Sequence, residues 1–279
     1  ALAWLDSERA GLVSAVQWAR EERYADTAVR LSQCLGEYLD WRRSFDDLIT
    51  VCGTAREAAH RAGNQIDGAI AWNSLGNALR EAGRGEEAID AHTHARDLYQ
   101  TAGDRHREAS AWNNLGNTLR QTGRAEEAID AHTHARDLYQ TAGDRHREAI
   151  AWNSLGGALR EADRAEEAID AHTHARDLFQ AVGDRHGEAL AWNNLGVALR
   201  STGLVEEAVE AYEKALEGCR EFDDWYRAGR TLLNLALAHQ RAARPAEARA
   251  HYLQSADAYT RANAPTEAAA AQSRADALT

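Results

Sequence analysis

The hydrophobic positions of this chain recur with the period of an α-helix. Trp112, Leu115, Gly116 and Leu119 fall at i, i+3, i+4 and i+7, which is one stripe of a helix. Gly123 follows this stripe, and glycine is the usual residue where a helix ends by turning through positive φ. The pattern therefore predicts a second helix beginning after Gly123, with its own stripe of Ala128, Ile129, His132, Ala135, Leu138 and Tyr139.

The ends of this second helix are also marked in the sequence. Glu126 and Glu127 stand in its first turn, where the helix dipole favours negative charge. Gly143 follows its last turn, and Asp144 is a suitable N-cap for the next helix. Two helices joined by a short turn predict an antiparallel pair.

This helix pair is repeated along the chain at a fixed period of about 40 residues, and self-similarity at such a period is the mark of a solenoid. The segment 111–149 recurs almost letter for letter from Ala71 and from Ala151, a looser copy begins at Ala191, and a last copy can be traced through Leu235, Ala248 and Ala256. Because no pair can bury both faces alone, stacked copies must form the core. The sequence predicts an all-α solenoid.

The register of the repeats divides the chain. Residues 1–24 are expected to form an N-terminal packing helix, and 25–64 a degenerate repeat in which Leu35, Gly36 and Leu39 precede their equivalents by one period. Residues 65–264 hold five repeats, and 265–279 a capping helix with a polar outer face. Pro245 falls in the first turn of a helix, where proline is tolerated.

Position by position, the repeat resembles the tetratricopeptide repeat. Its first helix matches that family's Trp–Leu–Gly signature, and its second helix matches the small–aromatic–small signature with histidine in the aromatic position. The matching residues are Trp112, Leu115, Gly116, Ala128, His132 and Ala135. The resemblance implies a right-handed superhelix of antiparallel helix pairs that binds proteins or peptides.

Two details refine this resemblance. The period is about 40 rather than roughly 34 residues, and Gln140 stands where the family often has proline. The literal Leu-Gly-Asn at 75–77 and 115–117 resembles the kinesin light chain and Leu-Gly-Asn-repeat subgroup. The opening segment 1–19 resembles the junction that enters the tetratricopeptide region of actinobacterial signal-transduction NTPases and antibiotic regulatory proteins. Since the chain also begins at Ala1 and has no methionine, we expect it to be part of a longer protein.

Polar residues form a ladder on the predicted first helices, where the family binds its partners on the inside of the superhelix. Within a repeat they are spaced i, i+4 and i+7, so they share a face apart from the Trp–Leu–Gly stripe. An asparagine amide both donates and accepts hydrogen bonds, which suits an extended peptide backbone, and arginine suits carboxylates. The alternative is that duplication merely copied solvated residues. The candidate peptide-binding residues are Asn73, Asn77, Arg80, Asn113, Asn117, Arg120, Asn153, Arg160, Asn193 and Arg200. At Leu233 and Leu237 the ladder becomes apolar.

Histidine is enriched in the same repeats, and its spacing argues against a metal site. His92, His132 and His172 take the aromatic position that Tyr212 and Tyr252 take later, so we interpret them as packing residues. In each His-Thr-His the two rings lie at i and i+2, on different sides of a helix, and cannot share an ion as i and i+4 could. A pH-sensing role remains the alternative.

Composition narrows the function. The formal net charge is −12, whereas a nucleic-acid-binding surface is expected to be basic. The stripe tryptophans are expected to be core residues rather than platforms for nucleic-acid bases; they are Trp72, Trp112, Trp152 and Trp192. Neither a membrane-length apolar run nor a signal peptide is visible. Three scattered cysteines and the absence of catalytic or phosphate-binding motifs predict a cytoplasmic protein that is not an enzyme and holds no metal or cofactor.

The sequence thus predicts a protein or peptide interaction module, the scaffold or sensor region of a larger bacterial regulator. Its expected partner is an extended segment, with acidic groups facing the arginines. A receptor for a small diffusible ligand or signalling peptide is the first alternative. An enzyme is the second, but it requires a cluster of titratable groups that the sequence does not contain.

Overall fold

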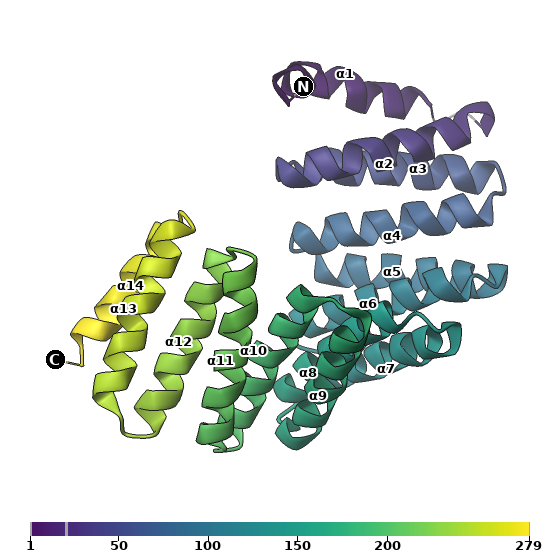
Figure 1. Ribbon diagram of the computed structural model, residues 1–279. Helices are drawn as coiled ribbons and strands as arrows, with labels where there is room; N and C mark the ends of the chain where they lie inside the picture. The colour runs from purple at the N-terminus through teal and green to yellow at the C-terminus, as the bar shows by residue number, and fades with distance from the viewer. Residues whose placement is uncertain (1, 20–21, 279) are drawn as a thin grey trace. The chain divides into compact units, whose positions relative to one another are not determined.

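Helices joined by short turns account for the chain wherever the structure describes it. The computed structural model describes residues 2–19 and 22–278, and these residues contain no strand. Contacts divide the chain into an N-terminal unit, residues 1–142, and a C-terminal unit, residues 143–279. The all-α prediction is confirmed, and each unit is a stack of helix pairs (Figure 1).

The described helices are shared between the two units. The N-terminal unit contains α1 (Leu2–Trp18), a short 3-10 helix (Glu22–Tyr24), α2 (Ala25–Trp41), α3 (Phe45–Arg61), α4 (Gln65–Glu81), α5 (Gly85–Ala102), α6 (Arg105–Gln121) and α7 (Ala125–Ala142). The C-terminal unit contains α8 (Arg145–Glu161), α9 (Ala165–Val182), α10 (Arg185–Ser201), α11 (Val205–Glu221), α12 (Trp225–Arg241), α13 (Pro245–Arg261) and α14 (Pro265–Asp276). From α2 to α13, each first helix is followed by its second helix, which packs against it.

The helix ends form where the sequence marks them. Gly123 has φ 79° and Gly143 has φ 71°, so both lie in the left-handed region that glycine adopts without strain. The side chain of Asp144 accepts a hydrogen bond from the backbone N–H of Arg147, at 3.0 Å, as an N-cap. Asp104, Asp184 and Asp224 cap α6, α10 and α12 in the same way.

The two helices of a pair meet where a glycine faces a ring. A Cβ atom on Gly116 would lie 2.7 Å from the His132 ring, closer than side-chain carbons approach one another. Gly196 faces the ring of Tyr212 in the same manner. His132 is 0% exposed. The packing role predicted for the histidines is therefore confirmed, and the ring fills the space that a missing side chain leaves.

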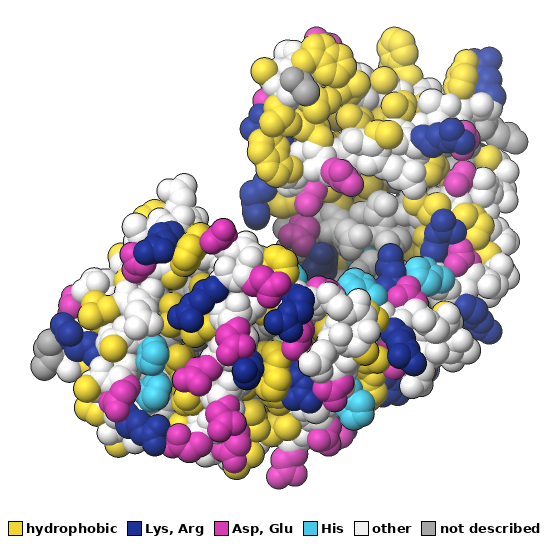
Figure 2. All heavy atoms as spheres, in the orientation of Figure 1, with side chains coloured by type: hydrophobic (Ala, Val, Ile, Leu, Met, Phe, Trp, Pro, Cys, Tyr) yellow, Lys and Arg dark blue, Asp and Glu magenta, His cyan; other side chains and the backbone are white. Residues whose placement is uncertain are grey.

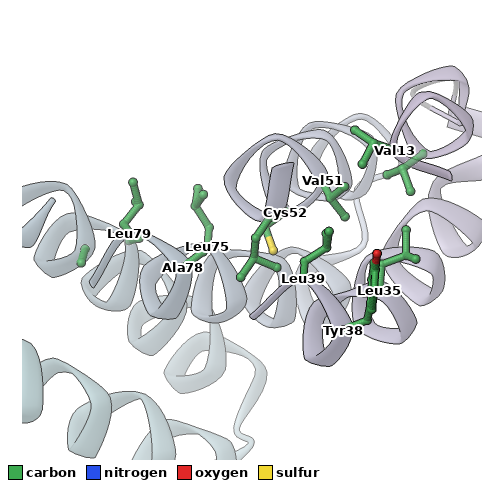
Figure 3. Packing of buried hydrophobic residues seen from close by; sticks show 13 residues of the cluster. Val13, Leu35, Tyr38, Leu39, Val51, Cys52, Leu75, Ala78 and Leu79 are labelled. Carbon is green, nitrogen blue, oxygen red and sulfur yellow. The ribbon is translucent and has the colours of Figure 1, made fainter. Parts of the chain in front are cut away.

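The first helix of the N-terminal unit packs across the first repeat. Val13 of α1 contributes to a buried apolar cluster with Leu39 and Val51 (Figure 3). The carboxylate of Asp6 accepts a hydrogen bond from Tyr38 Oη at 2.8 Å and also pairs with Arg42. α1 is thus attached to α2 by both apolar and polar contacts.

The tryptophans of the first helices are not fully buried, and our expectation that they are core residues is wrong in this respect. The Trp112 ring is half-buried, with the Arg96 guanidinium 4.5 Å from its centroid. His134 stacks on it with centroids 4.6 Å apart. Arg96 lies on α5 and His134 on α7, so the indole links two successive second helices. The reason is geometric: the indole lies at the edge of its stripe, between two helices rather than beneath them.

Candidate peptide-binding surface

The predicted ladder residues lie on the first helices of four pairs. α4 carries Asn73, Asn77 and Arg80; α6 carries Asn113, Asn117 and Arg120; α8 carries Asn153 and Arg160; α10 carries Asn193 and Arg200. Asn193 is buried, with 4% of its surface exposed, and the others are half-buried. These helices belong to two different units, and within each unit the ladder residues occupy equivalent positions.

The first asparagine of three repeats joins neighbouring first helices. Its Oδ1 accepts a hydrogen bond from the Nδ2 of an asparagine 41 residues later; the pairs are Asn73 with Asn114 at 3.1 Å, Asn153 with Asn194 at 3.1 Å, and Asn193 with Asn234 at 3.2 Å. These bonds hold successive repeats in register. The spacing of Asn114, Asn194 and Asn234 was a signal in the sequence that pointed to this contact.

Two of the first asparagines of the ladder, Asn113 and Asn153, contact buried histidines. Nδ1 of His132 lies 3.1 Å from Oδ1 of Asn113, and Nδ1 of His172 lies 3.0 Å from Oδ1 of Asn153. Since an amide oxygen only accepts, the ring nitrogen is the donor. The expectation that Asn113 and Asn153 stand apart from the packing is therefore wrong, because each amide oxygen accepts a hydrogen bond from a buried ring.

The arginines of the ladder lie close to carboxylates and to the buried rings. Arg80 pairs with Glu81 at 2.8 Å, and Arg160 pairs with Glu161 at 3.3 Å. The backbone carbonyl of Arg200 accepts a hydrogen bond from Arg241 at 2.9 Å. Two of the predicted carboxylate-binding groups thus already face an acidic side chain of the chain itself.

Burial determines the protonation of the histidines in the aromatic position. Desolvation lowers the pKa of His92 and His132 to about 3 and that of His172 to about 4. The positive charges of three ladder arginines lower these pKa values further; they are Arg80, Arg120 and Arg160. The rings are therefore neutral at physiological pH.

The second asparagine of the ladder is different in kind. Asn77 and Asn117 are half-buried, and neither side chain forms a hydrogen bond with the part of the chain that the structure describes. In the C-terminal unit the same register holds Gly157, Val197 and Leu237. At this position of the ladder, an amide side chain therefore occurs in the N-terminal unit and not in the repeats of the C-terminal unit.

A pocket of about 520 Å³ opens beside Asn77. Residues of α2, α3 and α4 line it, together with Asn114 of α6. Glu37, Asp40 and Glu81 bring carboxylates to its lining, against the single guanidinium of Arg80. The pocket is therefore polar and acidic, and a positively charged group is the complementary ligand chemistry.

Sequence reasoning missed the contribution of the degenerate repeat to this surface. Gln33, Glu37 and Asp40 stand one repeat before the three ladder residues of α4, and they line the same pocket. The constant repeat register was the available signal. This signal was obscured because the same position of the repeat carries a negative charge at Asp40 and a positive charge at Arg80.

Histidine, cysteine and carboxylate side chains outside the ladder are the remaining groups that could carry chemistry. They contain no group of three or more His, Cys, Asp or Glu side chains placed to hold a metal ion. In the first His-Thr-His, His92 is buried, whereas His94 is exposed and stacks on Trp72. Burial raises the pKa of the Cys52 thiol to about 12, which keeps it neutral and unreactive.

The face of the molecule drawn in Figure 2 is mixed in charge. On the face shown in Figure 2, basic and acidic side chains are interspersed rather than gathered into one basic region. Among the helices of the described residues, none is long and apolar enough to cross a membrane.

Comparison with known families gives a match over most of the chain. A tetratricopeptide repeat model matches four overlapping segments, at residues 67–141, 107–181, 147–221 and 187–261. The chain belongs to the tetratricopeptide repeat family. Members of this family are typically non-catalytic interaction modules. Comparison with curated protein sequences gives no significant match.

Solved structures share the fold of this tetratricopeptide protein at low sequence identity. A signal-transduction ATPase with a tetratricopeptide repeat sensor from Pyrococcus horikoshii matches with TM-score 0.70 and 14% identity, over 91% of this chain and 43% of that one. A Rap protein complexed with competence and sporulation factor matches with TM-score 0.63 and 15% identity, over 90% of this chain and 74% of that one.

A third structure represents the subgroup that the Leu-Gly-Asn motif resembles. A Podosopora anserina protein with nearly identical TPR-like repeats of kinesin light chain type matches with TM-score 0.61 and 12% identity, over 70% of this chain and 97% of that one. At these identities the likeness shows the fold alone, and the chain spans less than half of the ATPase.

Proposed function

We propose that this tetratricopeptide protein binds an extended segment of a partner protein along the first helices of its N-terminal unit, as the scaffold or sensor region of a larger cytoplasmic bacterial regulator. The observation that carries this proposal is the pocket of about 520 Å³, in which the unbonded amide of Asn77 meets the carboxylates of Glu37 and Asp40. A half-buried amide without a partner is a ready site for a peptide backbone.

The charges of the pocket give the segment a direction. Glu37 and Asp40 would face a basic side chain or a free amino group of the bound segment. The reason is that neither carboxylate forms an ion pair with another described residue. Acidic side chains of the segment would face Arg120, farther along on α6. The partner is therefore a peptide with separated charges rather than a uniformly acidic one.

A peptide selection tests the proposal. A phage-displayed library of random peptides would be selected against the protein, and the enriched peptides measured by calorimetry. We expect a loss of affinity of roughly five- to 150-fold in Asn77→Ala combined with Asn117→Ala, since each of the two lost hydrogen bonds is worth about 0.5–1.5 kcal/mol. Helicity should be unchanged, because neither side chain is bonded to another described residue.

The control variant lies on α6 as well. Asn113→Ala removes an amide that accepts a hydrogen bond from buried His132. It should therefore lower the melting temperature as well as the affinity for the enriched peptides, whereas the double variant should lower the affinity alone. Peptides that bind the Asn77→Ala, Asn117→Ala protein as tightly as the original would place the binding surface elsewhere. Failure to enrich any peptide would also contradict the proposal.

A receptor for a small diffusible ligand or signalling peptide is a second candidate, and the pocket volume favours it. Pockets of about 300–1,000 Å³ are typical of sites that enclose small ligands, and this pocket holds about 520 Å³. The Rap structure similar in fold contains a bound factor. Truncation of an enriched peptide distinguishes the two: a receptor would bind a short core as tightly as the full peptide, whereas a scaffold would lose affinity with each shortening.

A further inference from the structure

The last complete helix pair of the C-terminal unit lacks the stacked tryptophan of the earlier repeats. Leu232 of α12 stands one repeat after Trp192, in the same register. In the preceding pair the Arg176 guanidinium lies 4.5 Å from the Trp192 ring centroid. Leu216 stands one repeat after Arg176, so both members of this stack are replaced by leucine.

One further side chain becomes smaller at the same place. The Trp192 indole Nε1 donates a hydrogen bond to Glu188 Oε1 at 3.4 Å, and Ala228 takes the register of Glu188. Ala258 takes the register that Gly218 holds one repeat earlier and Leu178 two repeats earlier. The indole and its hydrogen-bond partner are thus reduced in size together, at a place where the leucine of Leu178 is already absent one repeat earlier.

These replacements coincide with a pocket of about 460 Å³ that α11, α12 and α13 line together. The three helices lie side by side in the C-terminal unit (Figure 1). Leu216, Leu232, Ala228 and Ala258 are among its lining residues, and each is 7% exposed or less. The floor of the pocket is thus apolar, and it occupies the register of the indole site in the repeat before it.

The rim of the pocket carries few charges. Asp257 pairs with Arg261 at 2.9 Å, and the Arg261 guanidinium lies 4.6 Å from the centroid of Trp225, which also lines the pocket. Arg220 is exposed and forms no ion pair with the described residues. Its guanidinium stands one turn after Leu216 and is free to lie against an aromatic ring, as Arg96 lies against a tryptophan in the N-terminal unit.

We propose that this pocket receives an aromatic side chain, best a tryptophan, from a partner protein. The chain itself provides the template, because an indole fills the corresponding space one repeat earlier and an arginine covers its face. The free positive charge of Arg220 complements the negative face of an aromatic ring. None of the ladder residues lines this pocket, so the site is independent of the peptide-binding surface of the N-terminal unit.

Nuclear magnetic resonance of leucine methyl groups tests the proposal on the whole chain. The probe is N-acetyl-L-tryptophanamide, compared with N-acetyl-L-alaninamide and with free indole. We expect saturable shifts at Leu216, Leu232 and Leu253 with the tryptophan probe and none with the alanine probe. If free indole binds and the tryptophan probe does not, the assignment of the pocket to a protein side chain is overturned.

Filling the pocket supplies the second arm. Leu232→Trp restores the residue of the preceding repeat, and Ala258→Leu restores that of Leu178. Each variant, if its circular dichroism is unchanged, should bind the probe at least tenfold more weakly. Arg230→Trp adds the same indole at an exposed position of α12 outside the pocket, and it should bind like the original protein. Shifts located elsewhere, or equal affinity in a folded filling variant, would overturn the proposal.

Discussion

At the scale of single residues, the contact between a glycine and a ring sets the distance between the helices of a pair. Gly116→Ala would place its Cβ 2.7 Å from the His132 ring, and Gly116→Leu would need still more room. Overpacking of this kind typically costs about 1–3 kcal/mol, so we expect a clear fall in the midpoint of urea unfolding.

The first repeat contains a matched control for this substitution. Gly36 holds the same register, but a Cβ there would meet only Leu48, at 3.9 Å. Gly36→Ala should leave the midpoint unchanged or raise it, because alanine has the higher helix propensity by about 0.5–1 kcal/mol. Equal destabilisation by Gly36→Ala and Gly116→Ala would contradict the role assigned to the ring.

The buried histidines predict a dependence of stability on pH. Their pKa values in the folded chain, about 3 for His92 and His132 and about 4 for His172, lie below the ordinary value of 6.5. Below that value the unfolded chain binds protons that the folded chain does not. The contribution of the neutral rings to the free energy of unfolding should therefore be complete above about pH 6.5 and fall as pH decreases from there.

Tyrosine in the same register offers the comparison. Tyr212 fills the aromatic position against Gly196, so the triple variant His92→Tyr, His132→Tyr, His172→Tyr should fold. Urea unfolding would be measured from pH 7 to pH 5, above the range in which most carboxylates titrate. We expect the triple variant to lose much less stability over this range than the original chain. Parallel curves would show that these histidines do not cause the dependence.

At the scale of the element, the turns within helix pairs differ in strain. Gly83, Gly123 and Gly203 follow the first helices of their pairs with positive φ, and Ala243 holds the same register with φ 56°. A left-handed conformation costs a residue with a Cβ roughly 1–2 kcal/mol. The backbone of the turn at Ala243 thus has the left-handed conformation of the other turns, although alanine replaces the glycine.

Ala243→Gly should therefore stabilise the protein. The relief of strain exceeds the extra entropy of glycine in the unfolded chain, which costs about 0.4–1 kcal/mol. A rise of up to about 1 kcal/mol in the free energy of unfolding would be measured by urea titration. Ala242→Gly is the control, because Ala242 has φ −77° and only the entropic cost applies there. Stabilisation by both substitutions, or by neither, would contradict this account.

At the scale of the whole molecule, stability is expected to be local. The helices of each unit pack almost entirely against their neighbours in sequence, as in other repeat proteins. The ends have a neighbour on one side only: α14 packs on α13, and α1 on α2 and α3. Local openings should therefore begin at the ends.

Hydrogen exchange measured by mass spectrometry checks this expectation. Amides of α14 and α1 should exchange first, and those of α5 and α6, which have neighbours on both sides, should exchange last within their unit. The variant Gly116→Leu should speed exchange in the N-terminal unit more than in the C-terminal unit. A uniform change across both units would show a single cooperative transition instead.

The sequence by itself determined the all-α fold, the helix ends and the aromatic position. These features depend on local chemistry that is visible in a few residues: the spacing of Trp112 and Leu115, the glycine at 123 and the N-cap at Asp144. Repetition made the inference stronger, because the same positions recur in successive copies. The family match at residues 67–141 and in three further overlapping segments agrees with it.

Tertiary structure decided which ladder residues are available. Asn73 and Asn77 have the same chemistry and lie one turn apart, yet one bonds to the next repeat and the other remains without a bonded partner among the described residues. The pattern of a single helix cannot distinguish them, because the difference depends on the neighbouring helix. The two pockets also depend on neighbouring helices, because side chains from several helices line each of them. The space between helices is determined by their packing, and no single stretch of sequence contains it.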